Sequence, residues 1–144
     1  MRKLDTIICH HSASPVDVLT WEDIRRIHVE ERGWSDCGYH FGVCRDDGKT
    51  FQVKQGRPVH IVGAHAKGHN ATSIGVCFEG NFDKGRMPEA QFLMGATLIS
   101  RLMEKYGIGK LIAHRDVAAT NCCGKYFPME TLRGWIADEM RFNR

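Results

Sequence analysis

Residues 74–79, Ile-Gly-Val-Cys-Phe-Glu, are the stretch that points most directly to a fold class. The large apolar residues Ile74, Val76 and Phe78 alternate with Gly, Cys and Glu, and a period of two is typical of a β-strand. Because the stretch carries a single polar residue, we expect this strand to be buried.

A long amphipathic helix and another short strand follow this stretch. Pro88 suits the first turn of a helix, and Gly107 suits its end. Between them, five apolar residues recur at helical spacing: Phe92, Ala96, Ile99, Met103 and Tyr106. Residues 111–114 are then predicted to form a strand.

The rest of the chain adds strands and two more helices. We expect strands over residues 3–10, 39–44 (with Tyr39, Phe41 and Val43 on one face), 50–54 and, at an edge, 59–62. Thr20 is a suitable N-cap for a helix that Gly33 ends. A last amphipathic helix carries Leu132, Trp135, Ile136 and Met140. This order predicts one α/β domain over residues 1–144, with a central mixed β-sheet flanked by helices.

Composition excludes some classes of partner. The 144 residues carry a formal net charge of +3 without a basic run, so nothing favours nucleic acid. No segment approaches the roughly 18 apolar residues of a membrane span, so we expect no membrane insertion. The basic residues Arg2 and Lys3 precede an apolar run that is too short for a signal peptide. We therefore expect synthesis in the cytoplasm, and release by another protein if the target lies outside the membrane.

The cysteines fall into two groups. Cys9, Cys44 and Cys77 lie in apolar strand-like runs and are interpreted as small core residues with reduced thiols. Cys37 has no evident role. The pair 122–123 differs, because it lies in a polar loop rich in small residues.

Three side chains form a candidate metal site. His10 and His114 each end an apolar run, where open α/β sheets present functional groups, and Cys122 follows His114 after a short loop. Two imidazoles and a thiolate suit zinc, and three protein ligands leave a fourth tetrahedral position for water. The set favours metal-assisted hydrolysis. Most other histidines are expected to be ordinary, and His28 is expected on the surface of a helix.

Motifs along the chain resemble those of the type-2 N-acetylmuramoyl-L-alanine amidases. These zinc amidases include lysozyme-type phage amidases and peptidoglycan recognition proteins. The motifs occur in family order: Ile8–Ser14, Gly38–Phe41, Gly63–Asn70, Ser73–Val76, and His114–Val117 followed by Thr120 and Cys122. The resemblance implies the fold of that family, a Zn²⁺ cofactor, and cleavage of the amide bond between N-acetylmuramic acid and L-alanine in peptidoglycan.

The resemblance also implies roles for single residues. His10, His114 and Cys122 would be the zinc ligands, with Cys123 as an alternative to Cys122. Tyr39 and Thr120 would be catalytic. Tyr39 would donate a hydrogen bond to the developing oxyanion or position the attacking water, and Thr120 would donate a second hydrogen bond to the oxyanion. Without the resemblance, Tyr39 could equally be a core aromatic, and Thr120 would be read as a hydroxyl capping a turn.

A polar loop is implied to line the substrate groove. Its substrate-binding residues would be His65, Lys67 and Asn70, with His69 beside them; the alternative is a solvated turn. Asp116 or a backbone carbonyl would orient a ligand imidazole.

Two positions separate the branches of this family. Lysozyme-type phage members have a lysine at the position of Thr120, whereas the recognition-protein enzymes have a threonine. Cytosolic recycling amidases, which act on soluble muropeptides, carry a catalytic glutamate on the central strand, where this chain has Cys77, with Glu79 two residues on. A non-catalytic peptidoglycan-binding module would typically lack the ligand cysteine. We therefore expect a monomeric enzyme acting on peptidoglycan, as a phage or prophage endolysin released by a holin; a bacterial autolysin is equally compatible.

Overall fold

A mixed five-stranded sheet forms the centre of the computed structural model, which describes residues 1–13 and 20–142. Its strands are β1 (Thr6–His11), β2 (Phe41–Cys44), β3 (Gln52–Gln55), β4 (Ser73–Phe78) and β5 (Lys110–Ala113). They lie in the order β3-β2-β4-β1-β5; β3 is an antiparallel edge strand, and the other neighbours pair in parallel. The strand predicted from residues 74–79 is thus the middle one, and the α/β prediction is confirmed.

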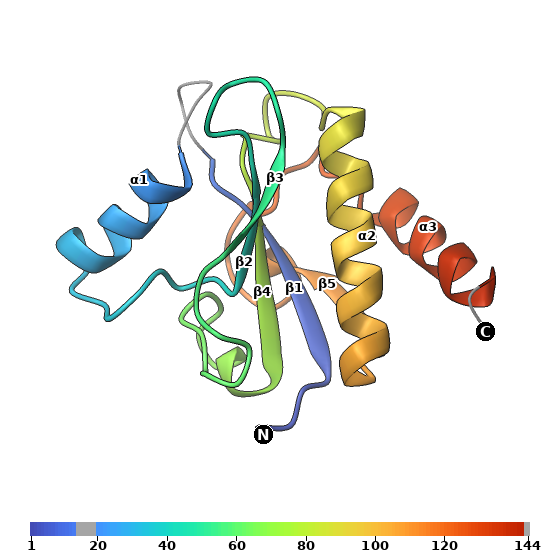
Figure 1. Ribbon diagram of the computed structural model, residues 1–144, viewed down its shortest axis with the longest axis horizontal. Helices are drawn as coiled ribbons and strands as arrows, with labels where there is room; N and C mark the ends of the chain where they lie inside the picture. The colour runs from blue at the N-terminus through green and yellow to red at the C-terminus, as the bar shows by residue number, and fades with distance from the viewer. Residues whose placement is uncertain (14–19, 143–144) are drawn as a thin grey trace.

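Helices cover both faces of the sheet (Figure 1). Helix α1 (Trp21–Arg26) lies on one face, where it packs Trp21 and Ile24 into a small cluster with three cysteines. Helices α2 (Glu89–Tyr106) and α3 (Met129–Phe142) lie on the other face. The Thr20 hydroxyl caps α1 and Gly107 ends α2 with φ 65°, as predicted. The α-helical part of the first helix ends at Arg26, earlier than predicted, and a π-helical segment, Ile27–Glu31, continues toward Gly33. Pro88 is the N-cap of α2 and not part of its first turn. No helix in the described part of the chain is both long and apolar enough to cross a membrane.

Alternation along the strands sends side chains to two faces. Ile7 and Cys9 of β1, like their neighbours Ile74 and Val76 of β4, belong to the main hydrophobic core with α2 and α3. His10 follows Cys9 and therefore points to the opposite face. The first candidate ligand thus faces away from the main core, toward α1 and the loops.

Two local predictions were wrong. Residues 59–62 form no strand, because the Ile61 N–H donates to the carbonyl of Pro58 and closes a turn that leaves Ile61 and Val62 each 44% exposed. Tyr39 does not share a face with Phe41, since β2 begins only at Phe41. Tyr39 instead packs against the cysteine cluster under α1.

The cysteines are free thiols, as expected. Cys9, Cys44 and Cys77 are fully buried, which confirms them as small core residues, and Cys37 is buried with them. Each therefore acts as a small apolar side chain within the core.

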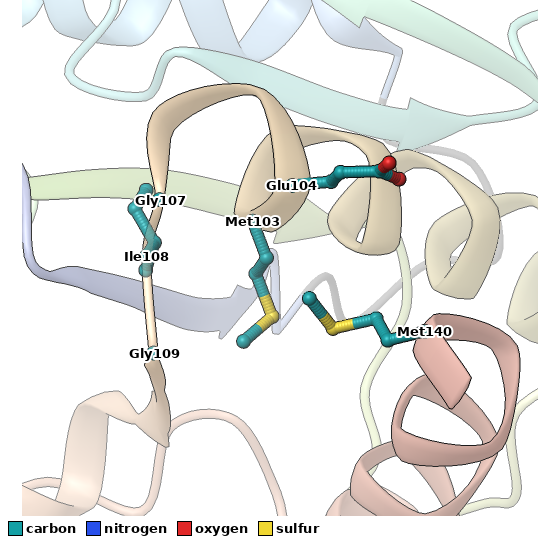
Figure 2. Close-up of a pocket in the computed structure, with 6 residues that line it drawn as sticks. All are labelled: Met103, Glu104, Gly107, Ile108, Gly109 and Met140. Carbon is teal, nitrogen blue, oxygen red and sulfur yellow. The ribbon is translucent and has the colours of Figure 1, made fainter. Parts of the chain in front are cut away.

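A hollow of about 430 Å³ lies where the end of α2 meets α3 (Figure 2). Met103 and Met140 point into it from the two helices, and the turn 107–109 forms its wall. This turn leads into the amino end of β5. The hollow therefore lies near the amino ends of the parallel strands, away from their carboxyl ends. Among the described residues that line it, Glu104 is the one with an ionisable side chain, so they offer no set of catalytic groups.

Candidate metal centre

The carboxyl ends of β1 and β5 bring two histidines together. These strands pair in parallel up to Cys9 and Ala113, so the next residues, His10 and His114, are neighbours, with ring centroids 4.6 Å apart. The loop after His114 returns Cys122, whose Sγ lies 3.7 Å from His10 Nδ1. One ligand atom from each of the three residues lies within 4.8 Å of the others. These residues form a candidate metal site.

The donor set and its spacing fit a tetrahedral zinc ion. With Zn–S near 2.3 Å and Zn–N near 2.0–2.1 Å, a tetrahedral angle separates sulfur from nitrogen by about 3.6 Å. The separation between Cys122 Sγ and His10 Nδ1 is 3.7 Å. His10 therefore offers Nδ1 to this position, and its Nε2 faces the protein interior, 2.9 Å from His65 Nδ1.

Burial affects the protonation of the three candidate ligands differently. Burial, reinforced by His65 and His114, lowers the pKa of His10 well below its ordinary value, and burial also lowers the pKa of His114. Burial raises the pKa of the Cys122 thiol to about 11, although the His11 N–H, 3.3 Å from Sγ, favours the thiolate. At neutral pH both imidazoles are therefore free to bind a cation, whereas the thiol must first lose its proton.

Cys123 occupies a different environment from Cys122. It is fully buried in the main hydrophobic core, packed among residues of that core such as Phe82 and Phe127. The group of possible metal ligands contains Cys122 and not its neighbour. Asp116 does not contact a ligand imidazole in any hydrogen bond of the described residues; its carboxylate accepts the N–H of Ala113 at 2.9 Å and caps the turn after β5.

Tyr39 lies against the first ligand. Its ring centroid is 5.0 Å from that of His10, and the thiol of Cys77 is a close neighbour of its hydroxyl. Burial raises the pKa of Tyr39 well above its ordinary value, so the phenol keeps its proton and can act as a donor.

Thr120 stands at the exposed rim of the same site. Its hydroxyl oxygen accepts the N–H of Cys122 at 3.2 Å, so it caps the turn that presents the thiol. A hydroxyl can accept one hydrogen bond and donate another at the same time. The turn-capping role and a role as donor to substrate are therefore compatible.

The loop 63–70 is only partly available to a substrate. His65 is 8% exposed, and burial lowers its pKa to about 3, so its ring is neutral. Asn70 Oδ1 accepts the backbone N–H groups of His65 and Ala66, each at 2.9 Å. These contacts give His65 and Asn70 roles inside the protein, which does not support their placement along a groove. Lys67 is exposed.

His28 is not on the surface, contrary to the sequence-based expectation. It is 7% exposed, its Nδ1 accepts the N–H of Gly38 at 2.8 Å, and its ring packs against Tyr39 and Trp34. It lines a cavity of about 160 Å³ beside Tyr39, together with Ser12, Ile24, Ile27 and Arg32. The signal for burial was present, because His28 follows the buried Trp21 and Ile24 at the spacing of one helix face.

Comparison with known proteins is consistent with this geometry. Residues 1–125 match the family described as N-acetylmuramoyl-L-alanine amidase. The chain is 39% identical over 137 residues to the endolysin of Escherichia phage T7, covering 91% of this chain and 84% of the relative. It is 30% identical over 130 residues to peptidoglycan-recognition protein SC2 of Drosophila melanogaster, covering 84% and 68%.

A solved structure shows the same fold. The N-acetylmuramoyl-L-alanine amidase LysC from Clostridium intestinale URNW superposes with a TM-score of 0.85 at 37% identity, covering 94% of this chain and 87% of that one. The chain therefore belongs to the N-acetylmuramoyl-L-alanine amidase family, and the resemblance drawn from its motifs is confirmed. Of those motifs, Ser14 lies outside the described residues.

Proposed function

We propose that this peptidoglycan amidase is a zinc enzyme that cleaves the bond between the lactyl group of N-acetylmuramic acid and L-alanine. The observation that carries the proposal is the convergence of His10, His114 and Cys122 at the end of β1 and β5. Zinc bound by these residues would polarise the amide carbonyl and activate the attacking water.

Side chains around the proposed metal site can donate hydrogen bonds to the reacting carbonyl and bind part of the substrate. The Tyr39 ring packs against the His10 ring, and its hydroxyl can donate a hydrogen bond to the carbonyl oxygen as that oxygen becomes negative. Thr120, on the loop that carries Cys122, can donate a second hydrogen bond from the exposed side. The cavity lined by His28 and Arg32 adjoins Tyr39 and offers a place for part of the substrate. Lys67, which is exposed on the loop 63–70, is proposed as a further substrate contact.

The biological setting we propose is that of a phage or prophage endolysin. Its support is the 39% identity to a phage endolysin over 91% of this chain. In this setting the enzyme acts as a monomer that reaches the wall after holin-type release. Peptidoglycan is its partner, and neither nucleic acid nor a membrane is required.

Substrate preference separates this function from that of a recycling amidase. The central strand carries Cys77 where recycling enzymes carry their glutamate, and Glu79 is buried with a carboxylate oxygen 3.7 Å from Arg45 Nε. We expect turnover of intact sacculi to exceed turnover of soluble anhydromuropeptides. A clear preference for the soluble substrate would favour the recycling function instead.

Thr120→Ala is expected to lower kcat more than it raises KM. The hydrogen bond from Thr120 matters mainly once the carbonyl oxygen is negative, so its loss acts on the transition state. Thr120→Lys should keep part of the activity, because an ammonium can donate to the same oxygen. Steady-state hydrolysis of a muramyl-peptide, with zinc content determined for each variant, checks this. Wild-type kinetics for Thr120→Ala would leave the residue with its turn-capping role alone.

Zinc affinity is expected to increase with pH. Burial raises the pKa of the Cys122 thiol to about 11, so at neutral pH the metal must displace its proton, whereas both imidazoles are already unprotonated. The dissociation constant for Zn²⁺ should therefore fall about tenfold per pH unit between about pH 7 and 9. Competition against a chelator of known pH dependence measures this slope. An affinity independent of pH would mean that no thiol binds the metal.

A further inference from the structure

Three hydrogen bonds connect the His10 ring to the interior of the protein. His10 Nε2 lies 2.9 Å from His65 Nδ1, His65 Nε2 lies 3.2 Å from Ser73 Oγ, and Ser73 Oγ lies 2.7 Å from the carbonyl oxygen of His69. From this chain of contacts we propose that His65 is a positioning residue for the metal centre, which holds the His10 ring so that Nδ1 faces the ion. The inference rests on the proposed function, in which His10 is a zinc ligand.

The far end of this chain sets the direction of every hydrogen bond. The carbonyl of His69 can only accept, so the single hydroxyl hydrogen of Ser73 is donated to it. The Ser73 oxygen then accepts the Nε2–H of His65. In a neutral imidazole the other nitrogen carries no hydrogen, so His65 Nδ1 accepts the Nε2–H of His10. His10 Nδ1 is left with a lone pair, directed to the side where Cys122 Sγ lies at 3.7 Å.

The His65 ring is held in place by close packing. A Cβ at Gly75 would lie 2.5 Å from its Cγ, and one at Gly63 would lie 2.8 Å from its Cδ2, so glycine is needed on both sides. The ring of His40 packs edge-on at a centroid distance of 5.8 Å. Asn70 fixes the backbone by accepting the His65 N–H. The ring therefore offers its acceptor from one fixed position.

A fixed acceptor behind a ligand imidazole has a definite effect on metal binding. It sets the ring orientation and the tautomer, and it makes the opposite nitrogen more basic. The buried side chain that first resembled a substrate contact thus acts through His10. Loss of such a partner typically weakens metal affinity about 10- to 100-fold.

His65→Phe tests this role, since it keeps an aromatic ring, slightly larger than imidazole, and has no acceptor. We expect its dissociation constant for Zn²⁺, measured by chelator competition, to rise about 10- to 100-fold. His65→Asn, whose Oδ1 can take the place of Nδ1, should recover most of the affinity. The matched control is His28→Phe, another buried histidine, which should lose stability but bind zinc as the wild type does.

A second variant and a spectroscopic measurement test the same role of His65 independently. Ser73→Ala removes the acceptor of the His65 Nε2–H with little change in packing and should also weaken zinc binding, even if His65→Phe does not fold. The visible spectrum of the cobalt-substituted protein should change in both variants, because the ligand geometry changes. Wild-type affinity and spectrum in both would overturn the inference. A wild-type protein that binds no zinc would instead contradict the proposed function.

Discussion

Cys122→Ser should leave the protein folded but without bound zinc and without activity. Serine is a poor zinc ligand, and the two imidazoles of His10 and His114 alone hold the ion weakly. Because the ligands act as a unit, we expect hydrolysis of sacculi to fall by at least about 10³-fold. Zinc content of the purified variant and its activity, measured together, check both parts of the expectation.

The neighbouring cysteine provides the matched control for this variant. Cys123→Ser places a hydroxyl in the main core, so it should lower the free energy of unfolding by about 1–3 kcal/mol. Its zinc content and its activity per folded molecule should remain those of the wild type. The reverse pattern, with loss of zinc in Cys123→Ser and retention in Cys122→Ser, would assign the ligand to Cys123.

Tyr39→Phe should reduce kcat by about 10²- to 10³-fold while zinc content and stability change little. The substitution keeps the ring that packs against His10 and removes only the hydroxyl. The effect is expected in kcat rather than in KM, because the donor acts on the charge that develops in the transition state.

Cys77→Ala is the control for this substitution. It removes the thiol that contacts the Tyr39 hydroxyl in the free protein but keeps the hydroxyl itself. Its kcat should stay close to that of the wild type. If Tyr39→Phe changed kcat by less than about threefold, the residue would be a packing aromatic without a catalytic role.

The sheet and its order of elements were predictable because their signals are local. The alternation around Val76, the helix between Pro88 and Gly107, and the cap at Thr20 depend on neighbouring residues, and the structure confirms all three. The meeting of His10 with His114 was also foreseeable, because both lie at the carboxyl ends of strands that run in parallel.

What escaped prediction depends on contacts between distant segments. His65 lies 55 residues from His10, and its ring occupies space that Gly75, on a separate strand, leaves free. Tyr39 looked like part of an alternating strand, but β2 starts only after it, so its ring lies on the other face of the sheet. His28 was predicted to lie on a helix surface and is buried, although its spacing from Ile24 already indicated burial.

The most direct test of the account is mass analysis of the products released from intact sacculi by the zinc-loaded protein. We predict glycan strands whose muramic acid residues carry a free lactyl carboxylate, together with stem peptides that begin with a free L-alanine amine. Both products should disappear with Cys122→Ser. Cleavage of a glycosidic bond, cleavage within the stem peptide, or binding to sacculi without release of either product would contradict the account.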